Sequence, residues 1–359
     1  MKKFWRLALS SLLIVSLWWL ALSAFATYRV RHFGVTPSFP YYASLLEETG
    51  PEQAVWAHFD GAHYLKLAKV GYVDIGTQAF FPVYPLLIRT LHLTGLSYFA
   101  SARLISFLSL VFSLVSLAYL FPRRARELSL VLLLFPTSFY LAGVYTESLF
   151  LFFTLLFFLL LRRRFFWLSA LVAGLASGTR LVGVFLALSL LIEIIKYKPR
   201  YALGLLTLSL SGFLGYLYFL NHQFGDPLMF AHVQSMFGAG RTSEIITLPQ
   251  VLYRYARILL TVNPQTLVFA RAVFELLTFI SAIYLAWSAR TKLTLPYTVY
   301  LWSALLLPTL SGSLSSFPRY LLVLIPFLVV SSVPKLYLAL SAAFMFVALS
   351  LFAAGLFVA

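Results

Sequence analysis

The aspartates of this chain are few, and their positions suggest where its chemistry takes place. The only three are Asp60, Asp74 and Asp226. A helix over residues 61–70 would place His63 and Tyr64 on the same face as Asp60, which directly precedes that helix. A carboxylate near an apolar phase has a pKa that favours accepting a proton. We therefore expect Asp60 to act as a general base, with His63 and Tyr64 as its neighbours.

Two other interpretations of Asp60 stay open at this point. In the first, Asp60 only caps the helix that follows it. In the second, His58, Asp60 and His63 bind a metal ion, because imidazole and carboxylate groups are common metal ligands. No fourth protein ligand is evident, and the chain has no cysteine, so thiolate sites and disulfides are excluded. We expect no resident cofactor and no metal site, with a divalent cation as the less favoured alternative.

Three further charged residues stand in otherwise apolar segments. Glu147 is the sole acid of its turn, where it either serves a site or caps a helix through the helix dipole. Arg180 lies in a short apolar hairpin, and Arg319 begins a late apolar segment. Guanidinium groups suit phosphate recognition, so we expect both arginines to bind a lipid phosphate. In the alternative, Arg180 pairs with Glu147 and Arg319 only anchors its helix at the membrane interface.

The elements that position these residues must lie in a membrane. Hydrophobic residues make up 61% of the chain and charged residues 11%, whereas soluble proteins carry roughly 25% charged residues. The mean hydropathy is +0.91. Long unbroken apolar runs such as residues 149–161 lack the alternation of a membrane β-barrel. The sequence therefore predicts one all-α, polytopic transmembrane bundle over residues 1–359.

The net charge of +16 is distributed unevenly, and this predicts the orientation of the chain. Fifteen of the 27 basic residues lie in short segments between apolar runs, with only Glu127 and Glu193 beside them. The positive-inside rule makes these segments cytoplasmic and explains the positive charge without a nucleic-acid partner. They are Lys2, Lys3, Arg6, Arg123, Arg124, Arg126, Arg162, Arg163, Arg164, Lys196, Lys198, Arg200, Arg290, Lys292 and Lys335.

The same pattern predicts about eleven crossings, with the N-terminus in the cytoplasm and the C-terminus outside. Loops 27–97 and 221–263 are then extracytoplasmic, and all three aspartates lie in them. Within the first loop, residues 80–93 carry two prolines and an arginine, which favours an interfacial helix. The expected spans are residues 7–26, 98–121, 127–145, 146–161, two short helices within 165–195, 201–220, 264–288, 294–311, 319–334 and 337–357.

The segment 165–195 is predicted to be irregular in a way that marks a site. Both of its flanks are basic, so an even number of crossings must fit into about 31 residues. Two helices of about 20 residues do not fit, whereas two short helices meeting near Gly178, Thr179 and Arg180 do. Irregular backbone at membrane depth is tolerated where it lines a wet cavity, so we expect Arg180 to face one.

Four sequence blocks together resemble the PIG-V-like mannosyltransferases, the family of GPI mannosyltransferase II and its prokaryotic relatives. Residues 56–72 read W-x-x-F-D-G-x-H-Y-L-x-L-A-x-x-G-Y and are followed by AFFPVYP at 79–85. Residues 145–150 read YTESLF, residues 174–183 read GLASGTRLVG, and residues 318–320 read PRY. The blocks occur in the family's order and cover most of the chain. His63 departs from the family, in which glutamine or a similar polar residue is also typical.

The resemblance implies a GT-C membrane fold and an inverting transfer of a hexose, mannose in most members, from a polyprenyl-phosphate donor. The acceptor would be an extracytoplasmic glycan, glycolipid or protein. The family's acidic residue of the first outer loop falls on Asp60. We expect substrate binding by the polar and aromatic residues in and near these blocks: His63, Tyr64, Asp74, Gln78, Tyr84, Glu147, Arg180, Arg319 and Tyr320.

A transporter or flippase of a lipid-linked sugar is the alternative function. Many transporters carry inverted repeats and place polar groups at the membrane midplane. This chain shows no such repeat, and most of its acids lie in the predicted outer loops. The sequence also lacks a glycine-rich nucleotide-binding loop, which favours a lipid-linked donor over a nucleotide donor.

Overall fold

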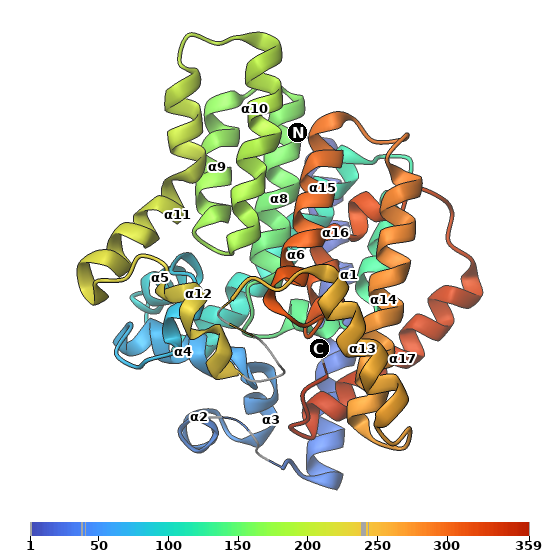
Figure 1. The fold of residues 1–359 in the computed structure, drawn as a ribbon. Coiled ribbons are helices and arrows are strands. Elements are labelled where there is room, and N and C mark those ends of the chain that lie inside the picture. Colours follow the sequence, from blue (N-terminus) through green and yellow to red (C-terminus); the bar gives the residue numbers. More distant parts are fainter. Residues whose placement is uncertain (1, 37–38, 40, 238–241, 243, 359) are drawn as a thin grey trace.

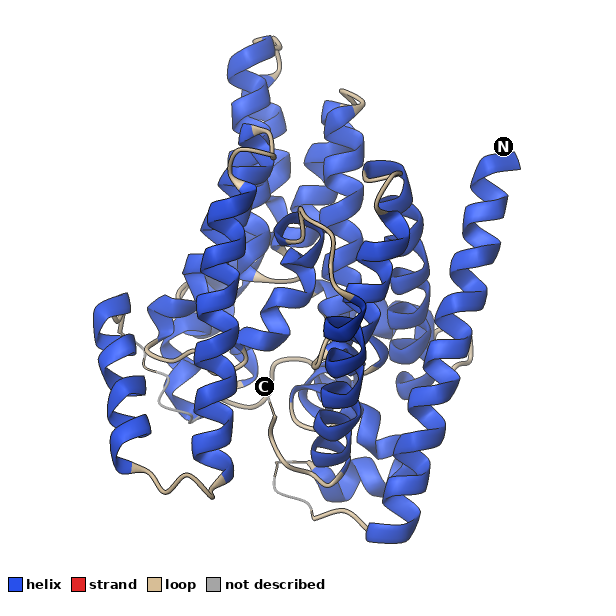
Figure 2. Ribbon diagram, turned by 90° about the vertical axis from the view of Figure 1, so that its right-hand side faces the viewer, coloured by secondary structure: helices blue, strands red, loops and turns tan. Residues whose placement is uncertain are grey.

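The computed structural model describes residues 2–36, 39, 41–237, 242 and 244–358, and within these ranges the chain forms helices joined by turns and loops, without a strand (Figure 1, Figure 2). The all-α prediction is therefore confirmed for the described residues. Five helices are long and apolar enough to cross a membrane. They are α1 (Lys2–Phe33), α6 (Tyr98–Leu120), α11 (Ala202–Phe224), α14 (Leu267–Ala289) and α17 (Lys335–Ala353).

Shorter apolar helices complete the bundle. They are α7 (Ala125–Leu134), α8 (Glu147–Arg162), α9 (Phe166–Ser177), α10 (Phe185–Tyr197), α15 (Leu295–Leu306) and α16 (Phe317–Leu328). Figure 1 shows α8, α9, α10 and α11 side by side, and the closest packing in this group is between α9 and α11. These lengths support a helical membrane protein, while eleven crossings and their sidedness stay predictions.

The expected span over 127–145 is wrong. Helix α7 ends at Leu134, and residues 138–142 form the 3₁₀ helix η3 (Ser138–Ala142). The reason is Pro136, which disfavours helical geometry in the preceding Phe135, found here in an extended conformation. The first helix is longer than expected, because α1 continues past residue 26 to Phe33.

The hairpin predicted within 165–195 is confirmed as two short helices. Helix α9 has 12 residues and α10 has 13, and the 3₁₀ helix η4 (Leu181–Val184) joins them after Arg180. Glycines allow this close packing. A Cβ atom on Gly183 would lie 2.4 Å from the backbone of Ala176, and one on Gly212 of α11 would lie 2.2 Å from the carbonyl oxygen of Gly174.

A group of small helices covers one end of the bundle, and we call it the polar cap. It consists of α2 (Tyr42–Thr49), α3 (Pro51–Ala54), η1 (Val55–Ala57), α4 (Asp60–Val70), η2 (Thr77–Ala79), α5 (Val83–His92), α12 (Met229–His232) and η5 (Val233–Phe237). Helix α4 confirms the helix expected over 61–70, and α5 matches the helix expected within 80–93.

The two ends of the molecule differ in what they carry. In Figure 1 the polar cap lies at the lower end, whereas the N-terminus and the basic connections α10–α11 and α14–α15 lie at the upper end. The second predicted outer loop, 221–263, contains α12, η5 and the amphipathic α13 (Leu248–Thr261), which the sequence analysis did not anticipate. Residues 238–241 and 243 of this loop lie outside the described residues.

Candidate functional site

Four charged residues from distant parts of the chain meet in one ion cluster: Asp60, Glu147, Arg180 and Arg319. Arg180 donates a hydrogen bond from Nη1 to Glu147 Oε1 at 2.9 Å. Arg319 Nε lies 3.0 Å from the same oxygen, and Arg319 Nη1 lies 2.8 Å from Asp60 Oδ2. The structure therefore joins the predicted base, the predicted acid and both predicted arginines in one place.

Asp60 is held at the start of α4 by the preceding backbone. Phe59 is the N-cap residue with a positive φ of 52°, so Asp60 is the first residue of the helix. The prediction that Asp60 only caps this helix is not supported, because its carboxylate pairs with Arg319. A backbone hydrogen bond from Val144 to Trp56 of 2.7 Å draws the 143–147 turn against this segment. That contact brings Asp60 and Glu147 together.

Glu147 is the first residue of α8 and the most deeply buried member of the cluster, with a side chain only 1% exposed. A carboxylate at a helix N-terminus is favoured by the helix dipole. Its Oε1 atom contacts both arginines, whereas its Oε2 atom is buried with no hydrogen-bond partner. Glu147 therefore aligns two guanidinium groups and keeps one oxygen uncommitted.

Arg180 reaches the cluster from the junction between α9 and η4. The junction is fixed by Gly178, whose carbonyl oxygen accepts a hydrogen bond from Val83 of α5 at 3.0 Å. The Arg180 side chain is 13% exposed and lies over the ring of Tyr320, 4.9 Å from its centroid. The pairing with Glu147 that the sequence left open is thus present, and it leaves part of Arg180 accessible.

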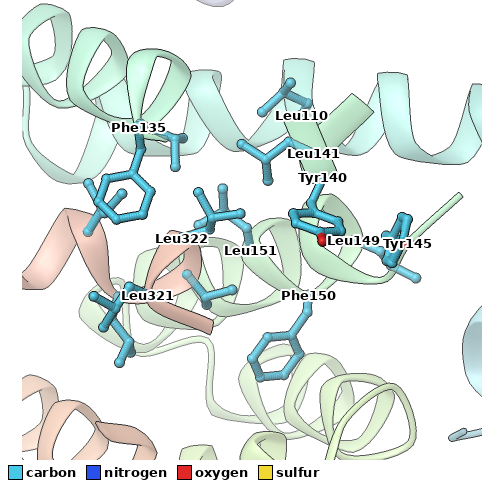
Figure 3. Close-up of a cluster of buried hydrophobic side chains, with 14 of the residues drawn as sticks. Leu110, Phe135, Tyr140, Leu141, Tyr145, Leu149, Phe150, Leu151, Leu321 and Leu322 are labelled. Atoms are coloured by element: carbon cyan, nitrogen blue, oxygen red, sulfur yellow. The ribbon is translucent and has the colours of Figure 1, made fainter. Parts of the chain in front are cut away.

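Arg319 stands in the first turn of α16, and three tyrosine rings surround its guanidinium group. The carbon at the centre of that group lies 5.3 Å from Tyr140, 5.5 Å from Tyr145 and 5.6 Å from Tyr320, measured to the ring centroids. Thr137 donates a hydrogen bond to the carbonyl oxygen of Pro318 at 3.0 Å and so fixes the start of α16. Figure 3 shows Tyr140 and Tyr145 beside the apolar residues of α8 that support them.

The sequence analysis identified Tyr320 but missed Tyr140 and Tyr145 as parts of the site. Both tyrosines are almost fully buried, and Tyr145 donates a hydrogen bond to the carbonyl oxygen of His58 at 2.5 Å. A signal was available, because both tyrosines occur in the polar turn before Glu147 in an otherwise apolar stretch. Without the fold, interfacial anchoring explains such tyrosines equally well.

His63, Tyr64 and Tyr84 lie next to the cluster but do not form ion pairs with it. His63 stacks on Phe80, with 4.8 Å between ring centroids, and burial lowers the pKa of His63. Tyr64 is buried and hydrogen-bonds to Thr146, next to Glu147, so it connects α4 to the start of α8. Tyr84 is fully buried and hydrogen-bonds to Ser106 of α6, which favours a packing role for Tyr84.

Asp74 and Gln78 belong to a different part of the polar cap. Asp74 pairs with Lys66 and accepts a hydrogen bond from Tyr41 at 2.7 Å, and these bonds lower the pKa of its carboxyl group. Gln78 is buried and bonds to backbone atoms, among them the Asp74 carbonyl oxygen at 3.1 Å. The structure does not bring either residue into the ion cluster, and it shows both as parts of the loop that shapes the polar cap.

The metal-binding interpretation of His58, Asp60 and His63 finds no support in the geometry. His58 is fully buried, and its Nδ1 atom lies 3.0 Å from the carbonyl oxygen of Phe352 in α17. Its ring therefore faces α17, while Asp60 faces Arg319. Among the described residues, no three His, Asp or Glu side chains are grouped closely enough to hold a metal ion.

The four residues differ in charge and in solvent exposure, and therefore in what they can do chemically. Two carboxylates and two guanidinium groups balance, so the buried cluster has no net formal charge. Asp60 is the more accessible acid, with 25% of its side chain exposed against 1% for Glu147. A small cleft of about 20 Å³ lies beside Arg180 and Tyr320, enough for about one water molecule. A carboxylate, which can accept a proton, and two guanidinium groups, which can bind an anion, thus meet at the edge of the polar cap.

The chain matches no family model, no curated protein and no solved structure. The resemblance described from the sequence blocks therefore stays a prediction. The function proposed below therefore rests on the geometry of the ion cluster.

Proposed function

We propose that this protein is a membrane glycosyltransferase. It would transfer a hexose, with mannose as the expected sugar, from a polyprenyl-phosphate donor to an extracytoplasmic acceptor by an inverting single displacement. The carrying observation is the ion cluster, in which an accessible carboxylate lies 2.8 Å from one of two arginines that share a buried glutamate. The four sequence blocks that resemble PIG-V-like mannosyltransferases supply all four residues of this cluster, one from each block.

The chemistry of the transfer matches these groups. The acceptor hydroxyl oxygen would form a bond to the anomeric carbon while the bond from that carbon to the phosphate oxygen breaks. Asp60 would take the proton of the hydroxyl group, and the polyprenyl phosphate would leave with the bonding electron pair. A phosphate leaving group requires positive charge rather than an acid, and Arg180 and Arg319 provide such charge.

Because Asp60 pairs with Arg319, binding of the donor phosphate would also change the basicity of Asp60. A carboxylate paired with a guanidinium group is a weaker base, because the charged form is stabilised. When a phosphate takes over Arg319, Asp60 is released from this pairing and becomes a stronger base. Proton removal would thus be favoured only when the donor is in place.

The direct test is the substitution Asp60→Asn, which keeps the size of the side chain but removes its capacity to take a proton. Transfer of labelled mannose from a polyprenyl-phosphate donor to membrane acceptors should fall by about 10²–10⁴-fold. The matched control is Asp226→Asn, which alters an aspartate bonded to His232 on the protein surface. Near-equal transfer by the two variants would exclude Asp60 as the base.

The arginines are tested with Arg180→Lys, which keeps the charge that pairs with Glu147 but loses the planar fork of donors. We expect a raised donor KM or a lowered kcat with an unchanged melting temperature in detergent. Unchanged donor kinetics would exclude phosphate binding by Arg180 and leave it as a structural partner of Glu147.

Two further measurements address the alternative and the sidedness. A transporter or flippase would move a lipid-linked sugar across vesicles without forming a new glycosidic bond, so product analysis separates the two functions. Cysteines introduced at Ser44 and Ser235, both exposed on the polar cap, should react with an impermeant maleimide in intact cells. Labelling only after permeabilisation would place the site in the cytoplasm.

A further inference from the structure

A groove with residues of α14, α16 and α17 in its lining opens between α14 and α17. Its volume is about 560 Å³, within the range of about 300–1,000 Å³ of sites that hold small molecules. Helix α14 lines it with Phe274, Leu277, Ser281, Leu285 and Ser288, spaced as one face of a helix. At 1.5 Å per residue this stripe is about 21 Å long, more than half the hydrocarbon thickness of a bilayer.

The groove is separate from the ion cluster, because α16 stands between them. Leu321, Ile325 and Leu328 of α16 line the groove. Tyr320 and Leu324 line the cleft beside Arg180. Positions 321, 325 and 328 share a helix face about half a turn away from position 319. A molecule in the groove is therefore screened from Arg319 by the helix that carries it.

Charge distinguishes the two ends of the groove. At the Phe274 end, Arg271 is paired with Glu275, with 3.7 Å between Nε and Oε1. At the Ser288 end, Arg290 and Lys292 follow α14 and are both exposed. Lys292 donates a hydrogen bond to Ser331 Oγ at 3.0 Å, and Ser331 lines the groove.

Glu127, the acid that contacts the 331–333 segment at the Ser288 end, is already engaged. Glu127 pairs with Arg124 at 3.0 Å and accepts a hydrogen bond from the backbone of Val333 at 2.5 Å. Arg124 in turn donates to the carbonyl oxygen of Ser331 at 2.6 Å. The segment 329–334 that forms this end of the groove is thus fixed in place. Lys292 adds positive charge directly beside it, and Arg290, which donates a hydrogen bond to the carbonyl oxygen of Trp287, follows the end of α14.

We propose that the groove binds an anionic glycerophospholipid. One acyl chain would lie along the α14 stripe, and the phosphate would sit between Arg290, Lys292 and the Ser331 hydroxyl group. Burial of apolar surface favours binding of the acyl chain, and basic residues beside a groove between membrane helices favour an anionic headgroup. The charge pattern predicts this end of the molecule to be cytoplasmic, which is where such headgroups are concentrated in many membranes.

The test uses the full-length protein in detergent with equal amounts of phosphatidylglycerol and phosphatidylcholine, and native mass spectrometry to count bound lipids. Ser281→Trp fills the groove from an exposed lining position, and Ile280→Trp adds the same bulk to a neighbouring residue that does not line it. We expect Ser281→Trp to reduce bound phosphatidylglycerol at least about tenfold, whereas Ile280→Trp leaves it unchanged.

The headgroup is tested with the double variant Arg290→Gln and Lys292→Gln. It should bind the two lipids equally, whereas the wild-type protein prefers phosphatidylglycerol. Arg163→Gln with Arg200→Gln, two exposed arginines on other connections, is the matched control and should keep the preference.

Four results would overturn the proposal. The first is equal binding of both lipids by the wild-type protein, and the second is equal occupancy in the two tryptophan variants. The third is a protein dimer that Ser281→Trp disrupts and that carries no lipid, which would make a second copy of the chain the occupant. Displacement of phosphatidylglycerol by an equal amount of polyprenyl phosphate would likewise assign the groove to a different lipid. None of these outcomes bears on Asp60, so the proposed transfer reaction is tested independently.

Discussion

The buried ion cluster and the ion pairs on the surface of the polar cap use the same residue types in opposite environments. Arg31 and Glu52 form a surface pair at 2.5 Å, with side chains 64% and 36% exposed. Lys69 pairs with Glu48 and Lys66 pairs with Asp74, also in partly exposed positions. In the ion cluster, by contrast, Arg319 is 6% exposed and Glu147 only 1%.

The two environments give ion pairs different effects on stability. Exposed pairs contribute about 0–1 kcal/mol and tolerate loss of one partner. Buried ions lose their hydration, so removing one partner leaves a charge that the interior cannot accommodate. The surface pairs join residues 8 to 21 positions apart, whereas the cluster joins positions 60, 147, 180 and 319. A costly arrangement built from four separate segments favours a functional interpretation over a structural one.

The largest effect on stability is expected from Arg319→Met, because Arg319 contacts both carboxylates of the cluster. Removing it should destabilise the protein by about 3–5 kcal/mol, as for other buried ion pairs that lose one partner. Thermal and chemical unfolding in detergent measure this effect. Arg31→Met removes an exposed arginine and should change the stability by less than about 1 kcal/mol. Equal losses in the two variants would contradict the contrast between the buried and exposed sites.

The packing that positions Arg180 is tested by Gly212→Ala. The added Cβ atom would lie 2.2 Å from the Gly174 carbonyl oxygen and 2.6 Å from the Gly178 nitrogen, so α9 and α11 would have to separate. Overpacking of this kind costs about 1–3 kcal/mol, and a clash between backbones belongs at the upper end. Gly215→Ala in the same helix meets nothing within 4 Å and should be stabilising by about 0.5–1 kcal/mol. A change in stability of the same sign in both variants would disprove the close approach of α9 and α11.

His58 shows how a buried group behaves when it lacks a charged partner. Burial lowers the pKa of His58 to about 4, well below its usual value of 6.5. The unfolded chain therefore binds a proton first as the pH falls, so stability is full above pH 6.5 and decreases toward pH 4. At pH 5 the loss should be about 2 kcal/mol.

Unfolding curves at pH 7.5, 6 and 5 check this expectation. His58→Gln should weaken the pH dependence, although it also removes a buried ring from the polar cap. His222→Gln changes an exposed histidine and should leave the dependence as in the wild-type protein. An unaltered pH dependence in His58→Gln would assign the acid sensitivity to other groups.

The smallest effect is expected from Lys66→Gln. Lys66 is about one third exposed and pairs with Asp74, whose lowered pKa also reflects a hydrogen bond from Tyr41. The stabilisation from Asp74 is present above its unfolded pKa and is lost as the pH falls through the lower folded value. Near neutral pH the melting temperature of Lys66→Gln should therefore differ little from that of the wild-type protein. A loss of stability as large as that of Arg319→Met would show that surface ion pairs also stabilise the fold strongly.

The helical elements and part of the site follow from local sequence properties. Apolar length predicted the long helices α6, α11 and α14, and basic flanks predicted the hairpin at Arg180. The span over 127–145 failed, because apolar composition outweighed the helix-ending effect of Pro136 in the prediction. The amphipathic α13 was missed because a membrane-scale window averages over its polar face.

By itself the sequence determined that this chain is a helical membrane protein, and it named Asp60, Glu147, Arg180 and Arg319 as separate candidates. Hydrophobicity and charge are properties of neighbouring residues, so they can be read along the chain. Only the tertiary structure decided that Glu147 contacts both arginines, that Asp60 faces Arg319 and that His58 faces α17. These outcomes depend on glycine contacts between α9 and α11 and on the Val144–Trp56 backbone bond, which join segments far apart in the sequence.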